Sequence, residues 1–204
     1  MDKEIFISHR NSDEKFVYLL KTFLTTCGIE SETIFCSSLP GNGVKYEISK
    51  EIKAAFQTSR LNIVLLSDGY YQSAYCQNEA GIIWYLDTEK TVFALPEINK
   101  FNMEGFLNSE YIIRRMDSKE DILTFSDNLR EIFPNFTTKF ADLNEKIDRL
   151  IEQYKSALSS REPLSPSIVS KDENEIDREL SGLGYTDEQL DDLIKEGLKE
   201  GWNS

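Results

Sequence analysis

The 204-residue chain has little of several residue types, and each shortage excludes a class of protein. Basic side chains are outnumbered, with 23 Lys and Arg against 36 Asp and Glu, which gives a formal net charge of -13. Because binding along a phosphate backbone needs clustered Lys and Arg, we expect no nucleic-acid partner. The single histidine, His9, cannot form a histidine metal cluster, so we also expect no metal site.

Long apolar runs and a leader segment are also missing. No stretch approaches the roughly 20 apolar residues of a transmembrane helix, so we expect no membrane insertion. Residues 1–4 lead straight into a strand-like run and do not resemble a signal peptide. Three cysteines, an odd number without CxxC spacing, fit a reduced cytosol, so we expect a cytoplasmic protein: Cys27, Cys36 and Cys76.

Apolar periodicity indicates alternating strands and helices over the first 135 residues. Five short runs are typical of strands: 4–8, 32–38, 61–67, 91–98 and 111–116. Helical spacing lies between several of these runs, and we expect Ser12 and Ser118 to cap two of the helices. Strands interleaved with helices predict an α/β fold, with a five-stranded parallel sheet flanked by helices.

The residues from 143 to 204 predict a different organisation. An apolar stripe at helical spacing runs from Leu143 to Leu158 and predicts a long helix that packs on the sheet domain. We therefore expect a first domain over 1–158, a Ser- and Pro-containing linker over 159–171 and an acidic helical hairpin over 172–204. The hairpin is too short to hold its own core, and it is either a solvated appendage or a partner-binding module.

One predicted helix carries a carboxylate on its apolar side. In "SDGYYQSAYCQNEAGIIWYL" (67–86), spacing of about 100° per residue places apolar side chains on one continuous arc, with Glu79 between Leu86 and Ile83. A carboxylate among apolar side chains loses hydration, so it is paired, exposed in a cleft or catalytic. The alternative without a functional role is a surface glutamate that is favoured by the helix dipole.

Chemically useful residues follow three of the predicted strands. Ligands of open parallel sheets bind outside the carboxyl ends of the strands, where segments 8–12, 37–43 and 67–75 should meet. Together they offer Arg10 and a helix amino terminus for an anion, tyrosine rings for a flat base, and the Glu79 carboxylate. This set suits a nucleotide. The GxGxxG and GxxxxGK[ST] loops of common dehydrogenases and NTPases are missing from the sequence.

Three motifs together resemble a known family. The motifs are "IFISHRNSDEKF", a strand running into "LPGNG", and the set Ser67, Tyr71, Ser73, Tyr75, Cys76 and Glu79. Over about residues 3–135, the chain is similar to a Toll/interleukin-receptor (TIR) domain of the bacterial kind. The resemblance implies a flavodoxin-like fold with a five-stranded parallel sheet, in agreement with the periodicity.

The resemblance also implies an activity and a site. It implies cleavage of NAD, as substrate and not cofactor, at the nicotinamide glycosidic bond by the glutamate at position 79, and a loop at 37–44 that moves over the substrate. Where the family often has a Trp-Cys pair, this chain has Tyr75 before Cys76. Some bacterial members serve antiphage defence, as in Thoeris systems, through a cyclic ADP-ribose isomer that activates a separate effector. The expected substrate-binding residues are Ser8, Arg10, Ser38, Leu39, Gly43, Ser67, Tyr71 and Tyr75.

Alternatives stay open for several of these assignments. The chain is either an NAD-cleaving enzyme, with a linear or a cyclic product, or a non-catalytic adaptor that acts through TIR-TIR contacts. Arg10 either binds phosphate or pairs with Asp13 or Glu14. The tyrosines either stack on a ligand or fill the core, and Cys76 is either a small apolar residue or a nucleophile. Self-association through the TIR domain is compatible with both functions.

Overall fold

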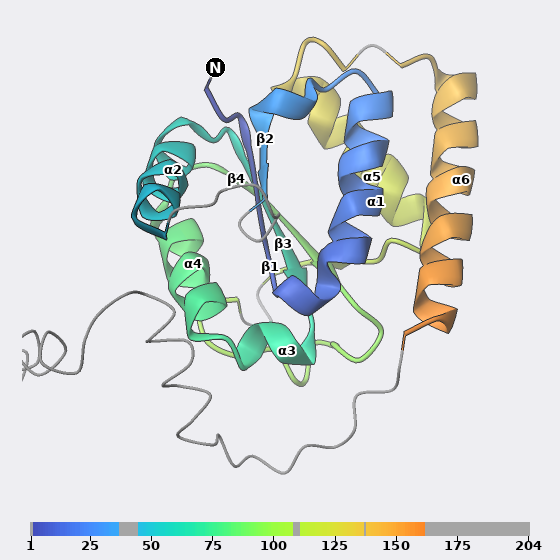
Figure 1. Cartoon of the computed structure of the whole chain (residues 1–204). Helices are drawn as coiled ribbons and strands as arrows, with labels where there is room; N and C mark the ends of the chain where they lie inside the picture. The colour runs from blue at the N-terminus through green and yellow to red at the C-terminus, as the bar shows by residue number, and fades with distance from the viewer. Residues whose placement is uncertain (1, 37–44, 108–110, 137, 162–204) are drawn as a thin grey trace, which may run out of the picture. The chain divides into compact units, whose positions relative to one another are not determined.

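The computed structural model describes residues 2–36, 45–107, 111–136 and 138–161 (Figure 1). The expected ligand residues Ser38, Leu39 and Gly43 lie outside the described residues, as do the predicted acidic hairpin and most of the predicted linker. The chain divides into two units, one formed by Met1–Gly43 with Glu47–Arg161 and one by Val44–Tyr46 with Glu162–Ser204. The fold below is that of the first unit.

The sheet is five-stranded and parallel, as the sequence predicts. Its strands are β1 (Ile5–His9), β2 (Ile34–Cys36), β3 (Leu61–Leu66), β4 (Glu89–Ala94) and β5 (Ile113–Arg114), in the order β2-β1-β3-β4-β5. This is the flavodoxin-like order, in which the chain leaves β1 first toward one edge and later toward the other. The point of reversal, between β1 and β3, is where such folds bind ligands.

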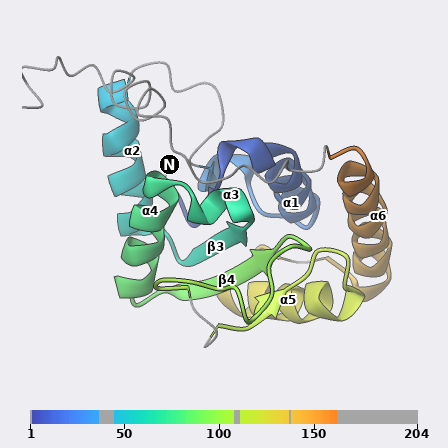
Figure 2. The same ribbon diagram turned by 90° about the horizontal axis from the view of Figure 1, so that it is seen from below.

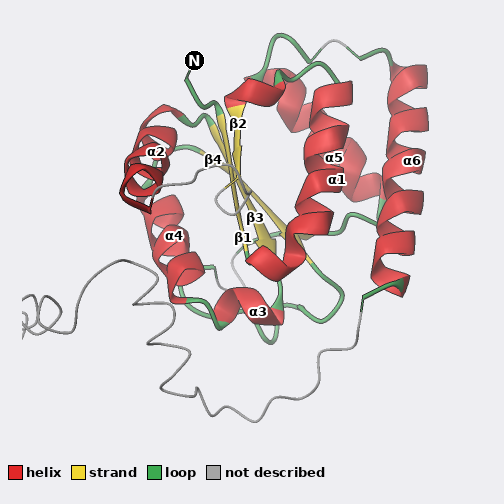
Figure 3. Cartoon of the chain, in the orientation of Figure 1, coloured by secondary structure: helices red, strands yellow, loops and turns green. Residues whose placement is uncertain are grey.

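Helices cover both faces of this sheet. They are α1 (Glu14–Thr26), α2 (Lys45–Thr58), α3 (Asp68–Tyr71), α4 (Ala74–Tyr85), α5 (Lys119–Ile132) and α6 (Phe140–Ser159), with 3-10 turns at Asn11–Asp13 and Ser31–Thr33. Figure 3 shows α2 and α4 on one side of the yellow strands and α1, α5 and α6 on the other. None of the helices in the described segments is long and apolar enough to span a membrane.

Two cores follow from the alternation of side chains along the strands. Ile5 and Ile7 point into a core shared with α1, α5 and α6, where the Phe16 and Tyr154 rings lie 5.4 Å apart. Phe6 points the other way and stacks on Phe56 of α2 at 4.1 Å. The apolar stripe of α6 is buried in the first core, which confirms that this helix packs on the sheet domain.

The structure differs from the sequence-based predictions at the start of one helix and on the apolar side of another. Ser118 caps α5 as predicted, by accepting a hydrogen bond from the Asp121 N–H at 3.2 Å. Ser12 does not cap α1, because Asn11–Asp13 form a 3-10 turn and α1 begins at Glu14. The predicted apolar arc of α4 is only partly buried: Ile82 and Trp84 are exposed.

Candidate active site

The candidate site lies at the carboxyl edge of the sheet, at the reversal between β1 and β3. Figure 2 views the sheet from the side where α3 lies. Helix α3 begins directly after β3, and Ser67 caps it by accepting the Tyr70 N–H at 3.1 Å. Ser73 caps α4 in the same way, by accepting the Cys76 N–H at 3.4 Å. These two caps fix the helices that carry Tyr70 and Glu79.

The Glu79 carboxylate meets the end of β1. Ser8 points to the same face of the sheet as Phe6, toward α4, because side chains alternate along a strand. Its Oγ donates a hydrogen bond to Glu79 Oε2 at 2.5 Å. Ser8 is fully buried and Glu79 is 8% exposed, so the carboxylate is recessed and retains a small accessible surface. The structure therefore brings together two residues that are 71 positions apart and were both expected at the site.

Tyr70 extends this contact by one further hydroxyl. Its OH lies 2.9 Å from Ser8 Oγ, and its ring is completely buried. Burial raises the pKa of Tyr70 well above its ordinary value, and the negative charge of Glu79 adds to the shift, so the phenol stays protonated. The sequence suggested only packing or stacking for this ring. Its proximity to Glu79 depends on the turn after β3, which periodicity does not reveal.

A second buried network lies beside the first. Asp13, 1% exposed, accepts a hydrogen bond from Ser67 Oγ at 2.5 Å. Arg161, two residues after the end of α6, pairs with Asp13 at 3.4 Å and with Glu97 at 2.8 Å. Burial raises the pKa of Asp13 despite the Ser67 hydrogen bond and the Arg161 charge. Both the Asp13 carboxylate and the Ser67 hydroxyl thus support the loops around the site, an arrangement that the sequence did not predict.

The remaining expected ligands are near these networks but differ in exposure. Arg10 follows β1 and is half-buried, and its Cγ would lie 3.3 Å from a Cβ built on Gly69 of α3. Tyr75, in the first turn of α4, is 50% exposed. Tyr71 is half-buried, and its hydroxyl donates to the Leu107 carbonyl at 3.4 Å. Tyr75 therefore offers the most accessible ring, whereas Tyr71 also packs against the core.

His9 and Cys76 are buried and uncharged at neutral pH. Burial lowers the pKa of His9 to about 4, so the imidazole cannot serve as a phosphate-binding cation at pH 7. Burial also raises the pKa of the Cys76 thiol to about 11, and its Sγ lies 3.5 Å from the His9 carbonyl as donor. A thiol in this state is a poor nucleophile, which favours the interpretation of Cys76 as a small packing residue.

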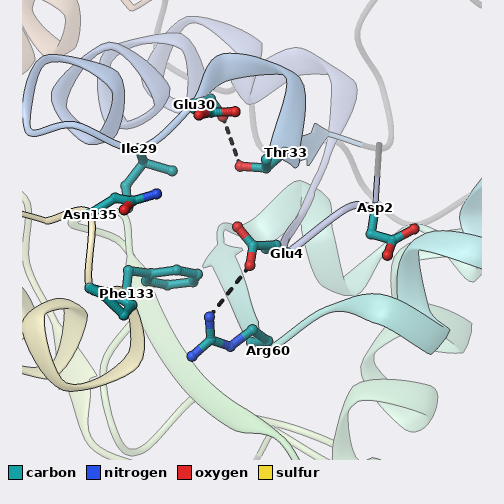
Figure 4. A pocket seen from close by; sticks show the side chains of 9 residues that line it. Asp2, Glu4, Ile29, Glu30, Thr33, Arg60, Phe133 and Asn135 are labelled. Carbon is teal, nitrogen blue, oxygen red and sulfur yellow. Dashed lines mark hydrogen bonds and ion pairs between the residues drawn. The ribbon is translucent and has the colours of Figure 1, made fainter.

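A cavity of about 320 Å³ lies at the opposite, amino edge of the sheet (Figure 4). Glu4, just before β1, pairs there with Arg60, just before β3, at 3.4 Å, and both side chains are well exposed. Its lining also includes the buried ring of Phe133. Across the described residues, no three His, Cys, Asp or Glu side chains cluster in a way that could hold a metal ion. The cavity therefore offers an exposed ion pair, whereas the recessed carboxylate lies at the other edge.

Comparisons with known proteins identify the family of this chain. The TIR domain family model matches residues 5–114, which include β1 to β5. The "Uncharacterized protein YddK" of Bacillus subtilis (strain 168) is 26% identical over 135 residues, which are 65% of this chain and 50% of that protein. The chain thus spans about half the length of this curated relative. TIR domains of the activated Roq1 resistosome directly recognizing the pathogen effector XopQ align with 90% of this chain and 100% of theirs, at 18% identity and a TM-score of 0.41. The match over more than half of the sequence establishes that the chain belongs to the TIR domain family.

Proposed function

We propose that this TIR domain cleaves NAD at the bond between nicotinamide and ribose, with Glu79 as the catalytic residue. The observation that carries the proposal is the recessed Glu79 carboxylate, which accepts the Ser8 hydroxyl at the reversal between β1 and β3. An acceptor held in a partly dry site is suited to stabilise positive charge that develops on a substrate. NAD develops such charge on its ribose when neutral nicotinamide leaves.

The proposed reaction needs few groups from the protein. Departure of nicotinamide leaves an oxocarbenium-like ribose, and the Glu79 carboxylate stabilises that charge or holds the ribose hydroxyls. Arg10 directly follows β1 and is proposed to bind phosphate. Tyr75 lies in the first turn of α4, the helix that carries Glu79, and is proposed to stack on a base. We also propose that segment 37–44 contacts the substrate through Ser38, Leu39 and Gly43.

The product depends on which nucleophile reaches the ribose. Water gives linear ADP-ribose, whereas a nucleophile from the adenosine half gives a cyclic isomer, which a site with little water favours. We propose a nucleotide signal of this kind in bacterial antiviral defence, acting in the cytoplasm on a separate effector. The three buried cysteines, which form no disulfide with one another, are in keeping with a reducing compartment.

Nicotinamide release by concentrated purified protein tests the proposal. The parent is compared with Glu79→Gln, which keeps the side-chain shape, and with Glu120→Gln, which removes an exposed carboxylate from the first turn of α5. We expect release by the parent and Glu120→Gln, and a fall of about 100-fold or more for Glu79→Gln. Chromatography with mass detection then separates cyclic from linear product. Equal release by all three folded proteins would contradict a catalytic Glu79.

A non-catalytic adaptor is the second candidate, and an exposed aromatic group favours it. Trp84 on α4 is 53% exposed and lies 5.1 Å from the ring of Phe106, which is 51% exposed. Exposed aromatic side chains that lie together are typical of protein contact surfaces. If no folded variant released nicotinamide even when tethered into assemblies, and Trp84→Asp abolished self-association measured by sedimentation, the adaptor function would replace the enzyme.

A further inference from the structure

We infer that Ser8 and Tyr70 are positioning residues for Glu79 and that Ser8 does not bind the substrate phosphate. The inference rests on the proposed function, since it concerns how the same carboxylate is held. Its basis is the chain of contacts from Tyr70 OH to Ser8 Oγ at 2.9 Å and from Ser8 Oγ to Glu79 Oε2 at 2.5 Å.

The direction of both hydrogen bonds follows from the number of protons. An ionised carboxylate only accepts, so the single Ser8 proton is donated to Glu79. Ser8 therefore accepts from Tyr70, whose OH is the donor. Because burial keeps the Tyr70 phenol protonated, this donor persists at neutral pH. Hydrogen bonds in such a chain polarise one another, so the Tyr70 donor strengthens the Ser8 contact to the carboxylate.

The hydroxyls of Ser8 and Tyr70 are buried, so they act on other groups of the protein and do not contact the substrate. Ser8 and Tyr70 both have no exposed surface, whereas Glu79 retains 8%. The three groups come from β1, α3 and α4, so the chain joins a strand to two separate helices. A carboxylate anchored in this way has its orientation set before substrate arrives, which is how supporting side chains contribute to catalysis. The hydrogen bond of Tyr70 reaches the Glu79 carboxylate through Ser8, so the two hydroxyls act in series.

The test uses variants that remove one hydroxyl at a time, alone and together. Tyr70→Phe and Ser8→Ala are compared with Tyr154→Phe and Ser126→Ala, which remove hydroxyls from buried residues of α6 and α5 on the other face of the sheet. Steady-state nicotinamide release gives kcat and KM for NAD, and urea unfolding of each full-length variant gives its stability. The controls report what the loss of a buried hydroxyl does to the fold alone.

We expect kcat to fall about 10-fold in Tyr70→Phe and about 30-fold in Ser8→Ala, with KM within about two-fold of the parent. The double variant should fall no further than Ser8→Ala, because Tyr70 acts through Ser8. Tyr154→Phe and Ser126→Ala should keep the parental kcat. If Ser8→Ala does not fold, Tyr70→Phe against Tyr154→Phe decides the matter.

Three outcomes would overturn the inference. The first is a parental kcat in Tyr70→Phe, and the second is a loss of kcat in the double variant that equals the product of the two single losses. The third is a rise in KM with unchanged kcat in Ser8→Ala, which would make Ser8 a substrate ligand. Failure of the proposed function looks different, because the parent and Glu79→Gln would then release nicotinamide equally or not at all. In that case positioning of a catalytic carboxylate is also refuted, whatever the hydroxyl variants do.

Discussion

The carboxyl and amino edges of this one sheet place polar side chains in opposite surroundings. The carboxyl edge holds two buried pairs, each with one short hydrogen bond. In one pair Ser8 donates to Glu79, and in the other Ser67 donates to Asp13. At the amino edge, the ion pair of Glu4 and Arg60 lies beside a cavity and faces water. The cavity therefore offers an exposed ion pair, whereas the buried carboxylates and hydroxyls lie at the carboxyl edge.

The difference shows where the fold accepts a cost in stability. A buried polar group destabilises the folded state unless it is hydrogen-bonded, so carboxylates and hydroxyls are concentrated in a core only where their partners are arranged with care. Exposed ion pairs contribute little and need no such arrangement. Sites that hold buried ionisable groups with shifted pKa values are commonly functional. Three such groups lie at the carboxyl edge: Asp13, Tyr70 and His9.

The largest difference in stability should appear when one carboxylate is deleted at each edge. Asp13→Ala leaves the buried Ser67 hydroxyl without its acceptor and removes one partner of Arg161, so we expect a loss of about 2–3 kcal/mol. Glu4→Ala should cost less than about 1 kcal/mol, because its pair with Arg60 is exposed. Urea unfolding at pH 7 measures both losses.

Asp13→Asn refines the same test. Asparagine keeps an acceptor for Ser67, and burial raises the pKa of Asp13, so loss of its charge should cost less than loss of the whole group. The expected order of stability is parent, then Asp13→Asn, then Asp13→Ala. Equal losses for Asp13→Ala and Glu4→Ala would show that the two edges do not differ energetically.

A pH-dependent effect of intermediate size should come from His9. Its pKa in the fold is about 4 against 6.5 when unperturbed, so between these values the unfolded chain binds a proton that the folded chain does not. The stability from neutral His9 is therefore complete above pH 6.5 and is lost as the pH falls toward 4, with roughly 2 kcal/mol gone at pH 5.

His9→Gln isolates this contribution, because glutamine does not titrate. Unfolding free energies at pH 7.5 and pH 5 are measured for the parent and the variant. The carboxylates are common to both proteins, so their contributions to the pH dependence cancel in the comparison. The parent should lose about 2 kcal/mol more than the variant over this interval. An identical loss in the two proteins would mean that His9 is hydrated in the folded state.

The smallest effect should come from one added methyl group beside Arg10. A Cβ at Gly69 would lie 3.3 Å from Arg10 Cγ, so Gly69→Ala displaces the stem of Arg10 by a few tenths of an ångström. We expect the KM for NAD to rise about three-fold through this displacement of a phosphate ligand. Gly81→Ala is the matched control, since its Cβ would meet the Phe106 ring at 3.4 Å. Equal KM values in both variants would remove Arg10 from the site.

Most of the fold could be predicted from local patterns. Continuous apolar runs predicted the buried parallel strands, and Ser118 predicted the start of α5. The stripe from Leu143 to Leu158 predicted a helix packed on the domain. The prediction of Ser12 as a cap was wrong because the chain turns through Asn11–Asp13 before α1. Local propensity could not predict the hydrogen bond between Ser67 and the Asp13 carboxylate, because the two residues are 54 positions apart.

The placement of the candidate site residues was predicted in part. Ser8 and Glu79 were expected near each other because the segment after the first strand and the start of the helix that carries Glu79 were predicted to meet. Their direct hydrogen bond agrees with that placement. The contact of Tyr70 with Ser8 and the pairing of Arg161 with Asp13 were not predicted, since they join residues 62 and 148 positions apart. Such pairings depend on how helices pack after the sheet has formed, which periodicity along the chain does not encode.

A crystal structure of Glu79→Gln soaked with NAD tests the central claim most directly. The substitution keeps the shape of the side chain while removing its charge, so uncleaved NAD can be retained. The account predicts that the ribose carrying nicotinamide contacts residue 79 at the carboxyl edge, with its phosphates toward Arg10. NAD bound in the cavity beside Glu4 and Arg60, or an empty carboxyl edge at saturating NAD, would contradict it.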